Sequence, residues 1–386
     1  MDGSHGVDAQ TRQDERLAAL LPRFAERAAV HDRSGEIALE TLDDLRQAGF
    51  LALAVPREKG GGGIGLRRTV DLVARVARAD PSSALILAMQ YLQTAGIACS
   101  STWPDDLRDE VLGSVVRDGA LVNALRVEPD LGTPARGGVP ATRVRRAGGR
   151  WLLSGQKIFS TGSSALTWGL VWGVTDEPEP RVGQIVVPLD LPGVRIEKSW
   201  HHLGMRATGS HTFVFDDVDI PDRYLTSLQP VGAGSPETAS VARWHAIIVA
   251  GLYDAIARSA RDWLVDFLHS RVPSALGRSL ATLPRFHSVL GEIDGLLLVN
   301  TALMERGLTQ AEAGQRAEDD GQIKRIMTEN AIAAVAKAIE VTGNPGLSQD
   351  NPLERHYRNV LCGRIHTPQA DMVLESAGKH VLVPAP

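Results

Sequence analysis

Residues 155–171, GQKIFSTGSSALTWGLV, lie near the middle of the 386-residue chain and govern how the rest is interpreted. This segment is too polar for a core strand and too apolar for a linker. Around it, short apolar runs alternate with Gly, Pro and Asp, which is typical of short β-strands joined by tight turns. These runs are 151–153, 170–172, 184–187 and 212–215. The pattern predicts a compact β sandwich or barrel in the middle of the chain.

The regions on both sides of these strands have helical patterning. Apolar residues recur at helical spacing over 17–28, and the four glycines at 60–63 must form a loop. Asp80-Pro81 is typical of a helix start, with Asp80 as the N-cap. Residues 235–237, Ser-Pro-Glu, predict the start of a long helical region. The prediction is an α+β fold with a helical domain over residues 1–120, a β domain over residues 121–226 and a second helical domain over residues 227–386.

Composition narrows the functional classes. A hydrophobic content of 43% is enough for two or three cores, and a net charge of −5 offers no basic field for nucleic acid. No apolar stretch reaches about 18 residues, and the N-terminus lacks the apolar segment of a signal peptide. The two cysteines, Cys99 and Cys362, fit a reducing compartment. We therefore expect a cytoplasmic protein without a nucleic-acid or membrane partner.

Motifs for several common chemistries are missing. His201 and His202 are adjacent and cannot both point into one site from a strand, and we predict no metal site. The glycine-rich run at 60–65 follows no clear strand, so it does not indicate a nucleotide-binding turn. No G-x-S-x-G elbow supports a serine hydrolase.

Several fragments, taken in order, resemble the acyl-CoA dehydrogenase superfamily over nearly the whole chain. They are Val55-Pro56, ADPSSA at 79–84, Glu128-Pro129, GGRWLLSGQKIFSTGS at 148–163, PGVRIEKSWHHLGMRATGSHTFVFDDVDIP at 192–221 and GNPGLSQDNPLERHYRN at 343–359. The resemblance implies an N-terminal helical domain, a middle β-barrel and a C-terminal four-helix bundle. It also implies a flavin between the barrel and the C-terminal helices, and usually a tetramer of identical chains.

The resemblance gives the opening segment a role beside the flavin. Phe159 occupies the position of an aromatic residue that packs against the flavin ring, and Thr161 that of a hydroxyl at the ring's N5 edge. The alternatives are a barrel-core role for Phe159 and a turn hydroxyl for Thr161. Lys157 is expected to be a solvated strand residue. The main chain of three further residues is implied to meet the pyrimidine edge of the flavin: Ala124, Arg126 and Val127.

Other implied cofactor contacts come from a neighbouring subunit. Arg271 matches an arginine sent to the cofactor pyrophosphate, and Gly343 and Asn344 match a turn that approaches the neighbour's cofactor. Ser274 stands where the family usually has an aromatic residue, so FMN becomes an alternative to FAD. Gln369 is also expected to contact the cofactor.

The position of the dehydrogenase base carries no acid. An acyl-CoA dehydrogenase needs a carboxylate near the flavin to remove the α proton of a thioester. Counting from Arg358-Asn359, the glutamate's position is Thr367, preceded by His366 and followed by Pro368. The stretch 240–251, where some members place the glutamate instead, contains no acid, and Glu237 lies just before it. The resemblance is then to the two-component flavin monooxygenase branch, which takes reduced flavin from a separate reductase and oxygenates a small substrate.

Three hypotheses follow. The first is a flavin-dependent monooxygenase in which His366, with Ser160, Ser163 or Ser164, stabilises or protonates the oxygenating species. His366 is the candidate because an imidazole can titrate near neutrality. The second is an acyl-CoA dehydrogenase with a base elsewhere, and the third is a non-catalytic flavin- or acyl-binding protein. The matching family helix faces the substrate, which gives candidate pocket residues, although core packing is the alternative for them: Met89, Leu92 and Gln93, with Tyr91 as a further polar contact.

Overall fold

The computed structural model describes residues 3–131, 138–233, 238–315 and 319–383. The expected helix start at 235–237, and with it the candidate base Glu237, lies outside the described residues. No helix in the described ranges combines the length and the apolar character that a membrane span needs.

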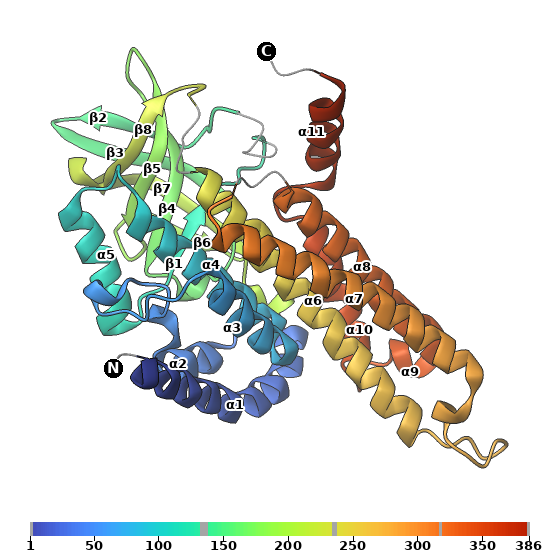
Figure 1. The fold of residues 1–386 in the computed structure, drawn as a ribbon. Helices are drawn as coiled ribbons and strands as arrows, with labels where there is room; N and C mark the ends of the chain where they lie inside the picture. Colours follow the sequence, from blue (N-terminus) through green and yellow to red (C-terminus); the bar gives the residue numbers. More distant parts are fainter. Residues whose placement is uncertain (1–2, 132–137, 234–237, 316–318, 384–386) are drawn as a thin grey trace.

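The N-terminal domain is helical, as expected (Figure 1). Its helices are α1 (Gly3–Ser34), α2 (Leu39–Gln47), α3 (Leu66–Ala79), α4 (Pro81–Cys99) and α5 (Asp105–Asp118). The predicted cap of α4 is present: the Asp80 carboxylate accepts hydrogen bonds from the main-chain N–H groups of Ser82 and Ser83, at 3.0 and 3.3 Å. It also accepts from the Ser83 hydroxyl at 2.6 Å. These bonds satisfy donors that have no partner inside the helix.

Replacing Asp80 by alanine is expected to lower the free energy of unfolding by about 1–2 kcal/mol, because three buried donors lose their acceptor. Asp80→Asn, which keeps a side-chain oxygen, should lose less. Urea unfolding of both variants measures the difference. Equal losses for the two variants would argue against capping as the main role of this carboxylate.

Within the described residues, the middle domain is one eight-stranded sheet. Its strands are β1 (Val122–Leu125), β2 (Arg143–Ala147), β3 (Arg150–Ser160), β4 (Trp168–Thr175), β5 (Arg181–Pro188), β6 (Val194–Glu197), β7 (His211–Ile220) and β8 (Leu225–Pro230). The order is β6-β7-β3-β2-β4-β5-β8, and β1 pairs with β4. A bridge between Val127 and Ile158 then returns from the end of β1 to β3, so one portion of the sheet closes on itself. The expected boundary at residue 226 falls inside β8.

The expectation that Lys157 is solvated is wrong. Its side chain is fully buried, and its Nζ lies 2.5 Å from Oε1 of Glu128. The same carboxylate accepts hydrogen bonds from the main-chain N–H groups of Ala141 and Thr142, at 2.6 and 3.0 Å. Because a buried charge needs a partner, Lys157 and Glu128 fix the end of β1 against β3.

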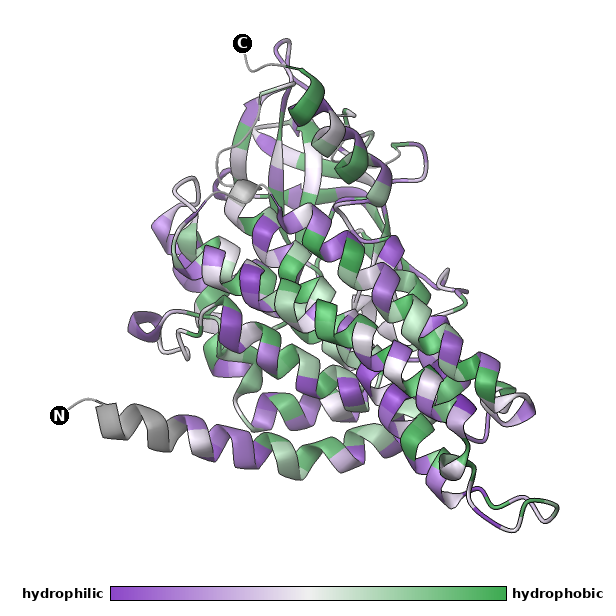
Figure 2. Ribbon diagram, turned by 45° about the vertical axis from the view of Figure 1, so that its right-hand side comes forward, coloured by the Kyte–Doolittle hydropathy of each residue, from purple (hydrophilic) through white to green (hydrophobic). Residues whose placement is uncertain are grey.

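The C-terminal domain is again helical (Figure 1). Its helices are α6 (Thr238–Ser270), α7 (Pro284–Glu312), α8 (Asp320–Thr342), α9 (Asn344–Leu347), α10 (Leu353–Leu361) and α11 (Ala370–Leu382). Figure 2 shows that the long helices carry both hydrophobic and hydrophilic residues, as amphipathic helices that share a core do. Asn300 is fully buried between them and donates to Asp254 at 2.8 Å and to the carbonyl of Met327 at 3.1 Å. The packing of α6, α7 and α8 thus includes a specific polar contact.

Candidate active site

One side of the candidate site is built by β1 and β3. The bridge between Val127 and Ile158 brings the main chain of 124–127 beside Phe159. Asn123 reinforces this arrangement, because its Nδ2 donates to the carbonyl of Thr161 at 3.0 Å and its Oδ1 accepts from the N–H of Ala124 at 2.8 Å. The residues implied to meet two edges of a flavin ring are therefore neighbours in the fold.

Phe159 is turned out of the barrel. The pairing of β3 with β7 shifts register between Lys157 and Ser160, and Phe159 has a positive φ of 58°, which is unfavourable for a bulky residue. Its side chain is 49% exposed and makes edge contacts with Trp200 and His202, whose rings lie 6.1 and 5.6 Å away between centroids. A barrel-core role is excluded, and the strained backbone presents an apolar ring at the surface.

The three serines around Thr161 differ in their availability. Ser160 and Ser163 are buried and donate to the carbonyls of Lys157 and Gly209, at 3.3 and 2.7 Å. Ser164 is exposed. The Thr161 hydroxyl lies 3.1 Å from the Ser210 hydroxyl. Because the hydroxyl groups of Ser160 and Ser163 already have main-chain acceptors, their role in this structure is to stabilise the turn around Thr161.

The other side of the candidate site is built by α6, α8 and the segment 365–369. Oγ1 of Thr367, at the position of the family's base, lies 3.5 Å from Nδ1 of His245 on α6. The neighbouring His366 has its Nε2 3.0 Å from the hydroxyl of Tyr253, also on α6. The two histidine rings lie 6.0 Å apart between centroids.

Lys324 on α8 holds this segment in place. Its side chain is buried, and its Nζ donates to the carbonyls of His366 and Pro368, at 2.6 and 3.2 Å. Among the described residues no carboxylate lies within ion-pair distance of it; Glu329, the acid whose charge acts on it, is bound by Arg364. Burial lowers the pKa of Lys324 to about 8. The segment that carries Thr367 at the position of the family's base is therefore held by the positively charged Lys324.

Burial, together with nearby positive charges, keeps both histidines neutral. Burial and the charges of Lys324 and Arg126 lower the pKa of His245 to about 4. Burial, His245 and Lys324 lower the pKa of His366 to about 3. The expectation that His366 titrates near neutrality is therefore wrong, because desolvation and a nearby cation both disfavour imidazolium.

Stability is expected to fall as the pH falls from about 6.5 towards 4. The unfolded chain protonates His245 and His366 near their ordinary pKa of 6.5, whereas the folded chain resists protonation down to about 4 and 3. The stabilisation is therefore complete above pH 6.5 and decreases by about 1.4 kcal/mol per pH unit for each histidine. Melting temperatures measured against pH should show this slope. A His245→Gln, His366→Gln double variant should have a flatter profile, and an unchanged slope would contradict the assignment.

The remaining predicted residues lie in two other places. Met89, Leu92 and Gln93 lie on α4, half-buried or buried, and Tyr91 is a core residue whose hydroxyl donates to the carbonyl of Phe50 at 2.7 Å. Tyr91 is therefore a structural residue and not a substrate contact. The residues implied to reach a neighbour's cofactor lie at the end of the helical bundle away from the sheet (Figure 1): Arg271, Gly343 and Asn344.

Gln369 marks the end of the segment that Lys324 holds. It lies at the N-cap of α11, and its Nε2 is 3.5 Å from the carbonyl of Ile365. Its place beside the base position is compatible with the expected cofactor contact, which stays a prediction.

The residues on the two sides of the site suit a flavin. The outward ring of Phe159 offers an apolar contact for an aromatic ring system, and the strained backbone that turns it outward is typical of functional sites. Lys324 on the opposite side and Arg126 beside β1 supply positive charge, which favours an anionic reduced ring. The fold and this site define a flavin-dependent oxidoreductase.

The chain belongs to the acyl-CoA dehydrogenase family. Models of the N-terminal, middle and C-terminal domains of acyl-CoA dehydrogenases match residues 13–102, 126–218 and 244–369. It is 30% identical to the putative acyl-CoA dehydrogenase YdbM of Bacillus subtilis (strain 168), over 95% of this chain and 96% of that protein. It is 28% identical to L-evernosamine nitrososynthase of a Micromonospora species, over 91% of this chain and 85% of that protein.

Solved structures agree with this assignment. KijD3 in complex with FMN and a dTDP-linked 3-amino-4-keto sugar has a TM-score of 0.85 and 27% identity, covering 99% of this chain and 95% of that one. Butyryl-CoA dehydrogenase of Megasphaera elsdenii has a TM-score of 0.83 at 21% identity, covering 96% and 98%, and supports the fold. The cofactor class is a flavin, FMN or FAD.

Sequence reasoning missed His245, Tyr253 and Lys324. His245 lies within the stretch 240–251, which contains no acid but does contain this histidine. The signal was present, because that stretch and Thr367 are the two alternative base positions of the family, and the fold places them in contact. Nothing in the sequence pattern indicates that Lys324, on a helix, binds two carbonyls of a distant loop.

Proposed function

We propose that this protein is a flavin-dependent monooxygenase that uses reduced FMN and oxygen on a small organic substrate. The observation that carries the proposal is the environment of Thr367. The side chains that make polar contacts with residues 366–368 are those of His245, Tyr253 and Lys324, and among the described residues no carboxylate lies within hydrogen-bond distance of residues 366–368. The similarity to a nitrososynthase and to KijD3 makes an amine nitrogen the first substrate class to test.

The charges at the site oppose the chemistry of a dehydrogenase. A base that removes the α proton of a thioester should have a pKa near the working pH, and an imidazole with a pKa of about 4 is a poor acceptor. The positive charges of Lys324 and Arg126 favour an anion in the site. A bound reduced flavin would supply the electrons and the oxygen-activating ring. Lys324 and Arg126 would balance its negative charge.

His366 and His245 would act as neutral hydrogen-bond donors. The Tyr253 hydroxyl holds the Nε2 of His366, which fixes the orientation of its ring. His245 contacts Thr367 through Nδ1, and its Nε2 has no hydrogen-bond partner among the described residues. We propose that His245 Nε2 and His366, as neutral hydrogen-bond donors, position the oxygen that leaves as water, while Phe159 and Thr161 would hold the ring; the proton for that oxygen would come from solvent.

The proposal includes partners. The exposed Arg271 and the turn at Gly343 follow the ends of α6 and α8 that point away from the sheet. This placement favours a homodimer or homotetramer in which subunits complete each other's cofactor sites. A separate flavin reductase would supply reduced FMN. Two unpaired cysteines are compatible with the cytoplasm as the compartment.

Acyl-CoA dehydrogenation is the second candidate, supported by the similarity to YdbM. It needs a carboxylate from outside the segment 365–369. The buried Asp320 precedes Gly321, which packs against Pro368, but Arg243 holds its Oδ2 at 2.7 Å. This ion pair engages the Asp320 carboxylate with α6, so Asp320 would have to leave it to act as the base. A non-catalytic flavin- or acyl-binding protein is the third candidate.

Stopped-flow mixing of the protein and chemically reduced FMN with oxygen tests the proposal. We expect oxidised FMN to form in a slower phase than with free flavin, and an accepted amine substrate to reduce the release of hydrogen peroxide. His366→Gln should raise peroxide release, and Ser288→Ala, a change at an exposed serine on α7 outside the candidate site, should not. Reoxidation indistinguishable from free FMN would reject the oxygenase proposal.

A further inference from the structure

A second cleft lies away from the candidate active site, between α1, α6 and α10. Its volume is about 970 Å³, and none of the residues proposed above for flavin chemistry lines it. Its walls combine apolar residues, among them Ala25, Ala29 and Trp263, with several arginines and acids. A cleft of this size is large enough for a small organic molecule.

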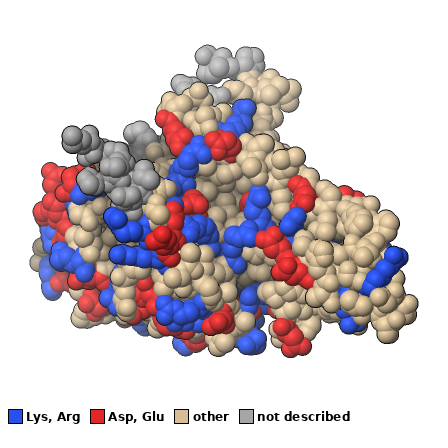
Figure 3. Space-filling view, turned by 60° about the horizontal axis from the view of Figure 1, so that its bottom comes forward, with Lys and Arg blue, Asp and Glu red and all other residues tan. Residues whose placement is uncertain are grey.

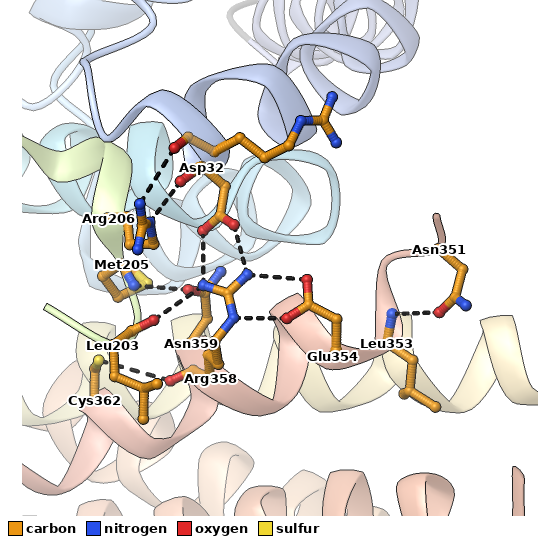
Figure 4. A network of polar contacts seen from close by, with 11 residues as sticks. Asp32, Leu203, Met205, Arg206, Asn351, Leu353, Glu354, Arg358, Asn359 and Cys362 are labelled. Atoms are coloured by element: carbon orange, nitrogen blue, oxygen red, sulfur yellow. Dashed lines mark hydrogen bonds and ion pairs between the residues drawn. The ribbon is translucent and has the colours of Figure 1, made fainter. Parts of the chain in front are cut away.

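Most arginines of the cleft are already engaged (Figure 4). Arg358 binds Asp32 at 2.6 Å and Glu354 at 2.7 Å. Arg206 donates to the carbonyl of Asp32 at 2.7 Å. Arg78 pairs with Asp262. These side chains therefore form the wall and have little capacity for a ligand.

Arg355 is different. Its side chain is only 8% exposed, it makes no ion pair or hydrogen bond with any described residue, and its Nε is buried without a partner. The acids whose charge reaches it are engaged elsewhere: Asp80 caps α4, and Asp32 and Glu354 bind Arg358. A guanidinium that is buried and unpaired is costly, and it is well shaped for two parallel hydrogen bonds to a carboxylate. Arg355 lines the cleft, so its guanidinium N–H groups can donate to a ligand there.

We propose that this cleft binds a small carboxylic acid, with its carboxylate on Arg355 and its apolar body against Ala29 and Trp263. Three exposed acids also line the cleft: Glu26, Asp266 and Asp350. Because they would repel a second negative group, the ligand should carry only one. Figure 3 shows basic and acidic side chains intermixed on this face. It does not show the continuous positively charged surface that would attract a polyanion. The flavin chemistry proposed above does not use this site.

Calorimetric titration with benzoate tests the proposal, with benzamide as the uncharged counterpart and inorganic phosphate as a purely anionic probe. Benzoate should bind, benzamide should bind at least about tenfold more weakly, and phosphate should bind more weakly than benzoate, because it lacks the apolar body. Arg355→Met should weaken benzoate binding about tenfold or more. Arg117→Met, a change at an arginine on α5 outside the cleft, should leave it unchanged.

Ala29→Trp provides an independent variant, because it fills the cleft and leaves Arg355 in place. It should also abolish benzoate binding, and it decides the question if Arg355→Met fails to fold. Equal binding of benzoate and benzamide, or benzoate binding that survives Ala29→Trp, would overturn the proposal. Occupation of the cleft by a second copy of the chain, visible as a concentration-dependent mass that Ala29→Trp disrupts while benzoate does not bind, would also overturn it.

Discussion

Replacing Lys157 by methionine is expected to destabilise the protein by about 3 kcal/mol or more, because Glu128 would be left as an unpaired charge inside the sheet. The loss should be near the lower end of the range for broken buried ion pairs, about 3–5 kcal/mol. Two main-chain N–H groups continue to hold the carboxylate. Urea unfolding followed by tryptophan fluorescence measures the change.

The Lys157→Met, Glu128→Gln double variant is the matched control. It removes both charges while the amide keeps a hydrogen-bonding oxygen, so it should recover some of the lost stability. The single variant should also weaken FMN binding, since Lys157 fixes the bridge that places Phe159. A loss below about 1 kcal/mol in the single variant would mean that the pair is not needed to hold β1 against β3.

Replacing Thr367 by glutamate is expected to create a base where the wild-type protein has none. A carboxylate at this position would lie beside His245, in the place from which the family's base acts. Positioned general bases accelerate proton transfer by about 10²–10⁴-fold. The flavin-loaded variant should therefore exchange the α protons of butyryl-CoA in D₂O at least about 100-fold faster than the wild-type protein, as followed by proton NMR.

Thr367→Gln, which has the same shape without the charge, is the control and should stay at the wild-type rate. Exchange by the wild-type protein at a rate comparable to that of Thr367→Glu would show that another carboxylate already serves the site. In that case Asp320, or Glu237 outside the described residues, would be the first group to replace.

Most of the fold could be predicted from local signals. Asp80-Pro81 is a strong helix start because the cap satisfies orphan donors, and the strands 151–153 and 212–215 follow from alternating runs between turns. The role of Lys157 could not be predicted in this way. A lysine in a polar strand segment is usually solvated, and only the closure of the sheet brings Glu128 to it. Burial of a charge is a tertiary property that the strand pattern does not contain.

The candidate site was only partly predictable. The absence of an acid at Thr367 is a property of the sequence, whereas the cationic character of the site is not. Lys324 is far along the chain from His366, and its two carbonyl contacts depend on how α8 packs against the segment after α10. The neutral state of His366 depends on the same packing, which is why an expectation based on its ordinary pKa failed.

The proposed function depends on a site that has positive charges and no carboxylate base where a dehydrogenase has its glutamate. The most direct test is anaerobic mixing of the flavin-loaded wild-type protein with a series of acyl-CoA thioesters. The absorbance of the oxidised flavin is expected to persist for every chain length, while the same preparation, reduced chemically and exposed to oxygen, reoxidises in a phase distinct from free FMN. Rapid bleaching by any of the thioesters would contradict the account and would identify the protein as a dehydrogenase with its base elsewhere.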